Sequence, residues 1–242
     1  MSVVIVYLTG ATACGKGTLG KRLAAEFGFY HISMGDLRRA HLDSIKLGVP
    51  HLDEAIREFV REERLIPPAL LAQYHTVPAV LQYYNHRAGG SKGWTTKLAA
   101  KMLSEELAVA RALAKSQGES VKVIILDGHP LTRGSNSSEL VDIYKEGYAG
   151  LTIVLETPRE VAKQRYLARA RSAGNNSGKF ESRMELTDSI LDDFIELMAG
   201  FGEIVYSENN AAMSIDDAYN VLLSNLNKSS IWPTLLALTG NT

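Results

Sequence analysis

Residues 3–20 have the sequence VVIVYLTGATACGKGTLG, in which an apolar, β-branched run leads directly into a glycine-rich turn. The run at 3–8 is typical of a buried strand, and apolar residues at helical spacing follow the turn. Gly10, Gly15 and Gly17 allow successive backbone N–H groups to turn inward around a phosphate, and the N-terminus of a helix adds partial positive charge. The order of strand, glycine-rich turn and helix therefore predicts a phosphate-binding loop.

The loop contains two residues suited to phosphoryl transfer. Lys16 is placed to reach the transferring oxygens, and the hydroxyl of Thr18 can bind magnesium. The alternative interpretation is a glycine-rich turn between strand and helix in some other α/β protein. We expect the donor nucleotide to contact Gly10, Ala13, Cys14, Gly15, Lys16, Gly17, Thr18 and Leu19.

The rest of the chain continues the alternation of strands and helices. Helical stretches separate four further short apolar runs, at 29–32, 121–126, 151–155 and 204–206. This alternation predicts an α/β fold with a doubly wound parallel sheet of five strands. The segment 37–118 is far longer than an ordinary crossover and contains amphipathic helical patterns. We therefore expect one domain over 1–242, with 37–118 as a helical insertion.

The composition excludes several classes of function. The 242 residues include 26 basic and 27 acidic side chains, so the net charge is −1 and no overall field recruits nucleic acid or an anionic membrane. The one cysteine cannot form an internal disulfide, and the six histidines show no metal-ligand spacing. The first residues lack a basic leader, and their apolar run is too short to span a membrane. We expect a cytoplasmic, monomeric protein without a nucleic-acid or membrane partner.

Four segments, in order, resemble the adenylate kinase and UMP-CMP kinase family of nucleoside monophosphate kinases. They are GKGT at 15–18, HISMGDLRR at 31–39, DGHP at 127–130 and TPREVAKQRYLAR at 157–169. The resemblance implies the P-loop kinase fold, with strand order 2-3-1-4-5. It implies transfer of the γ-phosphoryl group of ATP to a nucleoside monophosphate, with Mg2+ as the metal. It also implies that 37–118 binds the acceptor and that 171–183 forms a short lid.

The resemblance also implies roles for charged residues in these segments. Arg39 would bind the acceptor phosphate, and Asp36 would help to orient magnesium-bound waters. Arg165 would cover the donor adenine, while Arg169 and Arg183 would meet the donor phosphates. The spacing of Arg165 and Arg169, four residues apart, predicts that they share one face of a helix.

Asp127 ends the third apolar run. The carboxyl ends of parallel strands meet at the phosphate site, where a carboxylate can hold a magnesium-bound water. We expect the catalytic residues to be Lys16, Arg39, Arg169 and Arg183. The residues that hold the metal through waters would be Thr18, Asp36 and Asp127. The residues that bind the acceptor would be Ser33, Met34, Asp36, Arg39, Gly128 and Arg133.

The sequence departs from the family pattern on the acceptor side and in the lid. Leu131 stands where the family has an arginine that binds the acceptor phosphate, and we expect Arg133 to compensate for it. The lid sequence SAGNNSGK, at 172–179, lacks the paired aspartates of the family. Met34 and Ser135 match neither the adenylate nor the uridylate and cytidylate pattern, which leaves the base open. Two alternatives therefore remain: a kinase for another small acceptor, or a nucleotide-binding regulatory or assembly protein.

Overall fold

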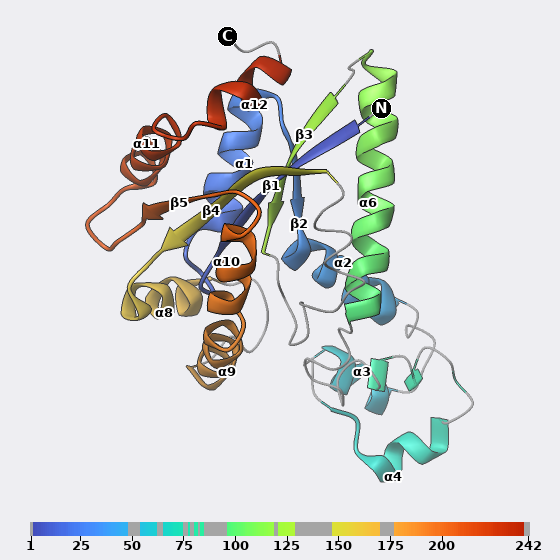
Figure 1. The fold of residues 1–242 in the computed structure, drawn as a ribbon. Coiled ribbons are helices and arrows are strands. Elements are labelled where there is room, and N and C mark those ends of the chain that lie inside the picture. Colours follow the sequence, from blue (N-terminus) through green and yellow to red (C-terminus); the bar gives the residue numbers. More distant parts are fainter. Residues whose placement is uncertain are drawn as a thin grey trace.

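The structure, a computed structural model, contains a five-stranded sheet in the order β2-β3-β1-β4-β5 (Figure 1). The strands are β1 (Ser2–Gly10), β2 (Tyr30–Ser33), β3 (Val121–Asp127), β4 (Tyr148–Glu156) and β5 (Glu203–Glu208). Every neighbouring pair is parallel. The predicted α/β fold, and the strand order that the resemblance implied, are confirmed. The structure describes residues 2–47, 54–61, 65–74, 77, 80–81, 83–84, 96–118, 121–128, 147–169 and 177–239.

The central strand β1 is buried on both faces, which explains its continuous apolar sequence. Ile5, Val6, Tyr7 and Leu8 are all fully buried. Because successive side chains of a strand point to opposite faces, Val6 and Leu8 belong to one hydrophobic cluster and Ile5 and Tyr7 to another. The two clusters lie on opposite sides of the sheet.

Helices cover both faces of the sheet (Figure 1). The layer around Val6 and Leu8 contains α1 (Lys16–Phe27), α11 (Ile215–Leu226) and α12 (Trp232–Leu238). The layer around Ile5 and Tyr7 contains α6 (Thr96–Ser116) and α10 (Leu191–Ala199). The arrangement is that of a doubly wound α/β domain, in which ligands bind at the carboxyl ends of the strands.

The C-terminal helix α12 is part of the core. Its Trp232 is 1% exposed, and the ring lies edge-on to Phe27 and Phe29, with ring centres 5.2 and 5.7 Å away. The turn before the helix is held by Glu203, whose carboxylate accepts hydrogen bonds from the hydroxyl groups of Ser229 and Ser230. The sequence alone gave this tail no partner.

The segment 37–118 divides into two parts. Its first part includes most of α2 (Met34–Leu47), together with α3 (Glu54–Arg61), α4 (Pro68–Leu71) and the 3-10 helix η1 (Ala72–Tyr74). Here a small separate cluster is built from Ile56, Val60, Ile66, Val80 and Tyr83. The last helix, α6, packs on the sheet through Leu103 and Leu107 instead. The acceptor-binding role of the segment stays a prediction.

Two helices pack directly on the phosphate-binding loop. They are α8 (Arg159–Ala168) and α9 (Ser177–Asp188). Their buried side chains form one cluster with the loop, made of Ala13, Ala162, Tyr166, Phe180 and Met184. The helix before the predicted lid, and the helix that contains its last residues 177–183, are therefore packed on the phosphate-binding loop.

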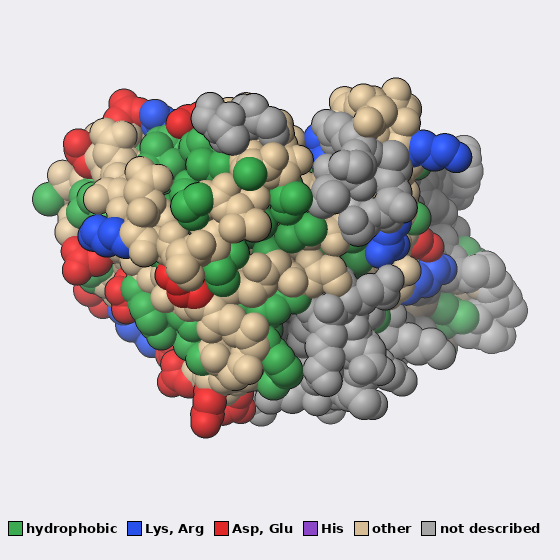
Figure 2. All heavy atoms as spheres, turned by 45° about the horizontal axis from the view of Figure 1, so that its top comes forward, with side chains coloured by type: hydrophobic (Ala, Val, Ile, Leu, Met, Phe, Trp, Pro, Cys, Tyr) green, Lys and Arg blue, Asp and Glu red, His purple; other side chains and the backbone are tan. Residues whose placement is uncertain are grey.

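Figure 2 shows how charged side chains are distributed on one face of the molecule. On the face drawn in Figure 2, Lys and Arg side chains lie at separate places among acidic and apolar ones. Within the ranges given above, no helix has both the length and the apolar sequence that crossing a membrane requires.

Candidate functional site

The turn between β1 and α1 has the backbone that a phosphate-binding loop requires. Gly10, Ala13 and Gly15 have positive φ angles of 136°, 64° and 104°. A Cβ atom at Gly10 would lie 2.4 Å from the carbonyl oxygen of Leu155, so only glycine fits there. The N–H groups of Thr18 and Leu19 donate to the carbonyl of Gly15, which starts the helix immediately after the turn.

The side chain of Lys16 lies across this loop. Its ammonium donates to the carbonyl oxygens of Gly10 at 2.8 Å and Ala11 at 2.7 Å, and it is 3.4 Å from the sulfur of Cys14. An ammonium has three donors and no acceptor, so the loop holds a localised positive charge at its centre. The motif predicts that the phosphates bind next to this charge.

One cavity of about 160 Å³ joins the loop to the start of α2. The cavity brings together most of the residues proposed from sequence: Ala13, Cys14, Gly15, Lys16, Gly17, Thr18, Ser33, Asp36, Arg39, Asp127, Gly128 and Arg169. The predicted donor and acceptor residues thus share a single hollow. Ser33 of β2 and Asp127 of β3 meet the turn that follows β1 there, because the carboxyl ends of these strands lie side by side.

Asp127 lies at the floor of this site. It pairs in register with Leu8 of β1 and Ser33 of β2, and it is 5% exposed. Its carboxylate is 3.6 Å from Nε2 of His31, a partner that sequence reasoning missed. The register explains the pair, since residues 31 and 33 of β2 point to the same side.

The oxygen atoms of Asp127 and Thr18 suit magnesium, a hard cation that prefers oxygen ligands. Among the residues that the structure describes, no group of three or more His, Cys, Asp or Glu side chains could hold a metal ion. Magnesium bound here would therefore keep most of its ligands as water and phosphate oxygens, which is its usual behaviour at nucleotide sites.

The part of the cavity next to α2 contains a carboxylate shared by two cations. Arg39 donates a hydrogen bond to Asp36, and the ammonium of Lys21 is 3.6 Å from the other oxygen of the same carboxylate. The backbone N–H of Asp36 donates to the hydroxyl of Ser33. Lys21 also lines the cavity, although no motif pointed to it. In the sequence, Lys21 is marked only by its position five residues after Lys16 on the same helix.

Two predicted contact residues have their side chains in the core. Met34 is fully buried, in the cluster that contains Ile32 and Leu126. Leu19 is 2% exposed, in the opposite cluster. Neither side chain lines the cavity. The reason is their position at the start of a helix that packs on the sheet, so only their backbone atoms are available to a ligand.

The expected common helical face of Arg165 and Arg169 stays a prediction, because Arg169 directly follows the end of α8. The last residue of α8 is Ala168, and Arg169 has an extended backbone with φ −78° and ψ 110°. Arg169 lines the cavity. Arg165 instead donates to the side-chain oxygen of Asn209 at 3.1 Å and to the carbonyls of Asn209 and Asn210.

Arg183 extends from α9, outside the set of residues that line the main cavity. Its guanidinium carbon lies 5.3 Å from the centre of the Tyr166 ring, a distance at which cation–π attraction operates. Arg183 is therefore held on the surface of the cluster that packs against the loop. Its predicted contact with the donor phosphates stays a prediction.

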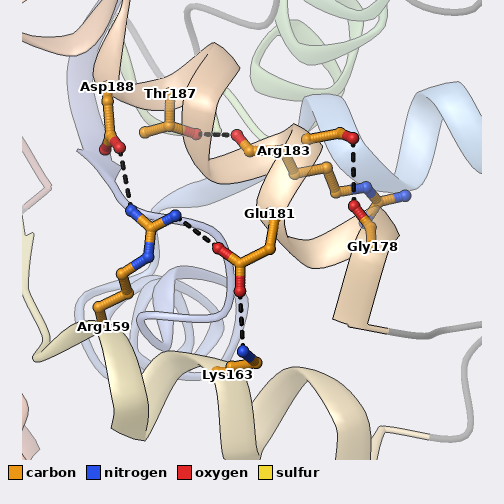
Figure 3. A network of polar contacts seen from close by, with 8 residues as sticks. Arg159, Lys163, Gly178, Glu181, Arg183, Thr187 and Asp188 are labelled. Atoms are coloured by element: carbon orange, nitrogen blue, oxygen red, sulfur yellow. Dashed lines mark hydrogen bonds and ion pairs between the residues drawn. The ribbon is translucent and has the colours of Figure 1, made fainter.

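Ion pairs connect α8 and α9, as Figure 3 shows. Arg159 donates to Glu181 at 2.6 Å and to Asp188 at 3.2 Å, and Lys163 lies 2.8 Å from the second oxygen of Glu181. The hydrogen bond from Lys163, together with that from Arg159, holds the pKa of Glu181 below its ordinary value. Leu131, Arg133 and residues 171–176 of the predicted lid lie outside the described residues.

We expect Glu181→Gln to lower the melting temperature at neutral pH and to have no effect in acid. A carboxyl group whose pKa is depressed in the folded state stabilises that state above its unfolded pKa. The contribution is lost as the pH falls through the folded pKa. Thermal melts of both proteins between pH 7 and pH 3 measure the difference. Glu185→Gln, one turn along the same helix, is the matched control, and an equal loss in that variant would contradict the role of the ion pairs.

Comparison with known proteins gives weak similarity over almost the whole chain. The chain is 23% identical to UMP-CMP kinase of Lentinula edodes over 222 residues, which cover 90% of this chain and 82% of that protein. It is 22% identical to adenylate kinase isoenzyme 1 of Caenorhabditis elegans over 231 residues, covering 94% and 90%. A stronger but local match, 39% over 75 residues, joins it to cytidylate kinase of Rhodopseudomonas palustris, covering 29% of this chain and 35% of that one. No protein-family model matches the chain.

Proposed function

We propose that the chain is a nucleoside monophosphate kinase that uses ATP. The resemblance found from the motifs is confirmed, and the chain is a divergent relative of the UMP-CMP and adenylate kinases. One observation carries this proposal. A single cavity contains both the phosphate-binding loop with Lys16 and the Asp36–Arg39 pair. A donor phosphate and an acceptor phosphate bound to these two groups would be adjacent.

The chemistry needs no nucleophilic side chain. An oxygen of the acceptor phosphate attacks the γ-phosphorus directly, so the protein has to position the two substrates and neutralise charge. Lys16 and Arg169 neutralise charge on the donor side, and Arg183 joins them from α9. Arg39 holds the acceptor phosphate in line. When bound at Thr18 and Asp127, magnesium supplies positive charge to the phosphate oxygens.

The names of the relatives suggest UMP, CMP and AMP as acceptors. The test is ADP formation from ATP and magnesium in the presence of AMP, CMP, UMP or GMP, or of their deoxy forms. We expect acceptor-dependent ADP formation with at least one of them. A protein that binds ATP but forms ADP with none of these acceptors would contradict the proposal. Such a result would favour either a different small acceptor or a nucleotide-binding protein without transferase activity.

We expect Arg39→Ala to weaken use of the acceptor while sparing ATP. A lost charge-assisted hydrogen bond to the acceptor phosphate should lower kcat/KM for the acceptor about tenfold to a hundredfold. The KM for ATP should not change, because Arg39 lies on the α2 side of the cavity. Steady-state kinetics with each substrate varied in turn measure both values. Arg38→Ala, the neighbouring arginine that does not line the cavity, is the control. An acceptor KM that is the same in Arg39→Ala and wild type would show that Arg39 does not bind the acceptor.

A further inference from the structure

A buried asparagine after β5 connects three parts of the donor side. Asn209 is 6% exposed. Its side-chain NH₂ donates to the carbonyl of Cys14 at 2.8 Å, its side-chain oxygen accepts from Arg165 at 3.1 Å, and its backbone N–H donates to the carbonyl of Glu156 at 2.8 Å. A carbonyl can only accept and a guanidinium can only donate, so these two neighbours fix which end of the amide is which.

The Cys14 carbonyl depends mainly on this asparagine. The hydroxyl of Thr157 lies 3.3 Å from the same carbonyl, but it is closer, at 3.0 Å, to the carbonyl of Asn209. Because a hydroxyl has one hydrogen to donate, its contact with Cys14 is the weaker of the two. The approach of Asn209 also requires glycine at position 15, where a Cβ atom would lie 2.5 Å from the asparagine nitrogen.

Holding the Cys14 carbonyl also sets the direction of the next N–H group. A trans peptide is planar, so the N–H of Gly15 points away from the carbonyl of Cys14. Gly15 lines the main cavity, whereas Asn209 does not. With its carbonyl directed to Asn209, this peptide presents its N–H on the cavity side.

We propose that Asn209 is a positioning residue for the phosphate-binding loop, and that Arg165 acts through it. Asn209 directs the Gly15 N–H toward a bound phosphate, and the three hydrogen bonds from Arg165 hold Asn209 and Asn210 in place. The inference rests on the proposed function only in naming the ligand, a donor polyphosphate. In this proposal Arg165 positions the loop through Asn209, a role that does not involve the adenine base.

The arrangement explains why an amide is needed at this position. A carboxylate would pair with Arg165 as well as or better than the amide does, since both bind the guanidinium through oxygen. It has no hydrogen for the carbonyl of Cys14, however, and would place two oxygens against each other. Asn209→Asp therefore keeps the contact with Arg165 and removes only the contact with the loop.

The test compares Asn209→Asp with Asn210→Asp in the full chain. Asn210 accepts a hydrogen bond from the N–H of Ala212 through its side-chain oxygen, which a carboxylate can also do. The second variant thus adds the same charge one residue away without removing a donor. The probes are tripolyphosphate, which has no base, and ATP, with affinities measured by calorimetry. Kinetic constants for ATP and the acceptor are measured in parallel, together with melting temperatures.

We expect Asn209→Asp to weaken binding of tripolyphosphate and ATP about tenfold or more. The acceptor KM should stay near that of the wild type, which a merely structural role would not allow. Equal affinities in wild type and Asn209→Asp, or an equal loss in Asn210→Asp, would overturn the proposal. If Asn209→Asp does not fold, Asn209→Ala removes the same donor without adding charge, and the same expectations apply to it.

Arg165→Ala separates the two roles of the arginine. If it acts through Asn209, tripolyphosphate and ATP both bind more weakly. A loss confined to ATP would assign Arg165 to the base and overturn its part in the proposal. These affinities can be measured whether or not the chain transfers a phosphoryl group, so failure of the kinase proposal and failure of this one give different results.

Discussion

Replacing Lys16 with methionine is expected to lower the rate of phosphoryl transfer on the order of 10³-fold or more, with the fold retained. The ammonium is the localised charge at the centre of the loop, 2.8 and 2.7 Å from the carbonyls of Gly10 and Ala11. Methionine has similar length and no charge, so the substitution removes the positive charge and its two hydrogen bonds to the loop but little side-chain volume. The side chain belongs to none of the hydrophobic clusters, and the core should not change.

The measurement is the single-turnover rate with saturating ATP and acceptor, together with a thermal melt. Lys101→Met is the matched control, because Lys101 lies on α6 with a largely exposed side chain paired to Glu105. That variant should have wild-type activity. A folded Lys16→Met protein with undiminished transfer would show that this loop is not the donor site.

The fold was predictable because it is encoded in short-range patterns. A strand covered on both faces must be continuously apolar, as 3–8 is, and each alternating helix must bury one stripe. The phosphate-binding loop was predictable for a similar reason. Gly10 and Gly15 have positive φ angles, a local property of the backbone that favours glycine.

The contacts that complete the site were not predictable, because they join residues far apart in sequence. Asn209 and Cys14 are 195 residues apart, and nothing near Asn209 marks it as a partner of the loop. His31 pairs with Asp127 only through the register of β2 and β3. Trp232 has no local pattern that indicates its contact with Phe27 and Phe29.

The end of α8 was not predictable from the sequence, because no stop signal marks it. The sequence from Arg159 onward has neither glycine nor proline before Gly174, so nothing in it ended the helix at Ala168. The two arginines also differ in their contacts, because Arg165 donates to Asn209 whereas Arg169 lines the cavity.

Two carboxylates were predicted to hold magnesium through waters, and the structure distinguishes them. Asp36 is half exposed and already shared by Lys21 and Arg39. Asp127 is almost fully buried beside the loop, with an oxygen 3.4 Å from where a Cβ atom of Gly17 would lie. An ion pair with two cations leaves Asp36 little capacity to attract a third. We therefore expect Asp127 to be the main contributor to magnesium binding.

Asp127→Asn should lower magnesium-dependent transfer on the order of 10²- to 10³-fold, since the amide keeps the size and removes the charge. Asp36→Asn should cost less and should act mainly on the acceptor KM. The Asp127 variant should melt at the same temperature as the wild type or higher, because burying a carboxylate costs free energy that an amide does not. Activity titrated with magnesium chloride, beside thermal melts, gives both results. A variant that kept wild-type turnover and wild-type magnesium dependence would exclude Asp127 as the residue that holds the metal, whereas lower activity with a lower melting temperature would reduce its role to packing.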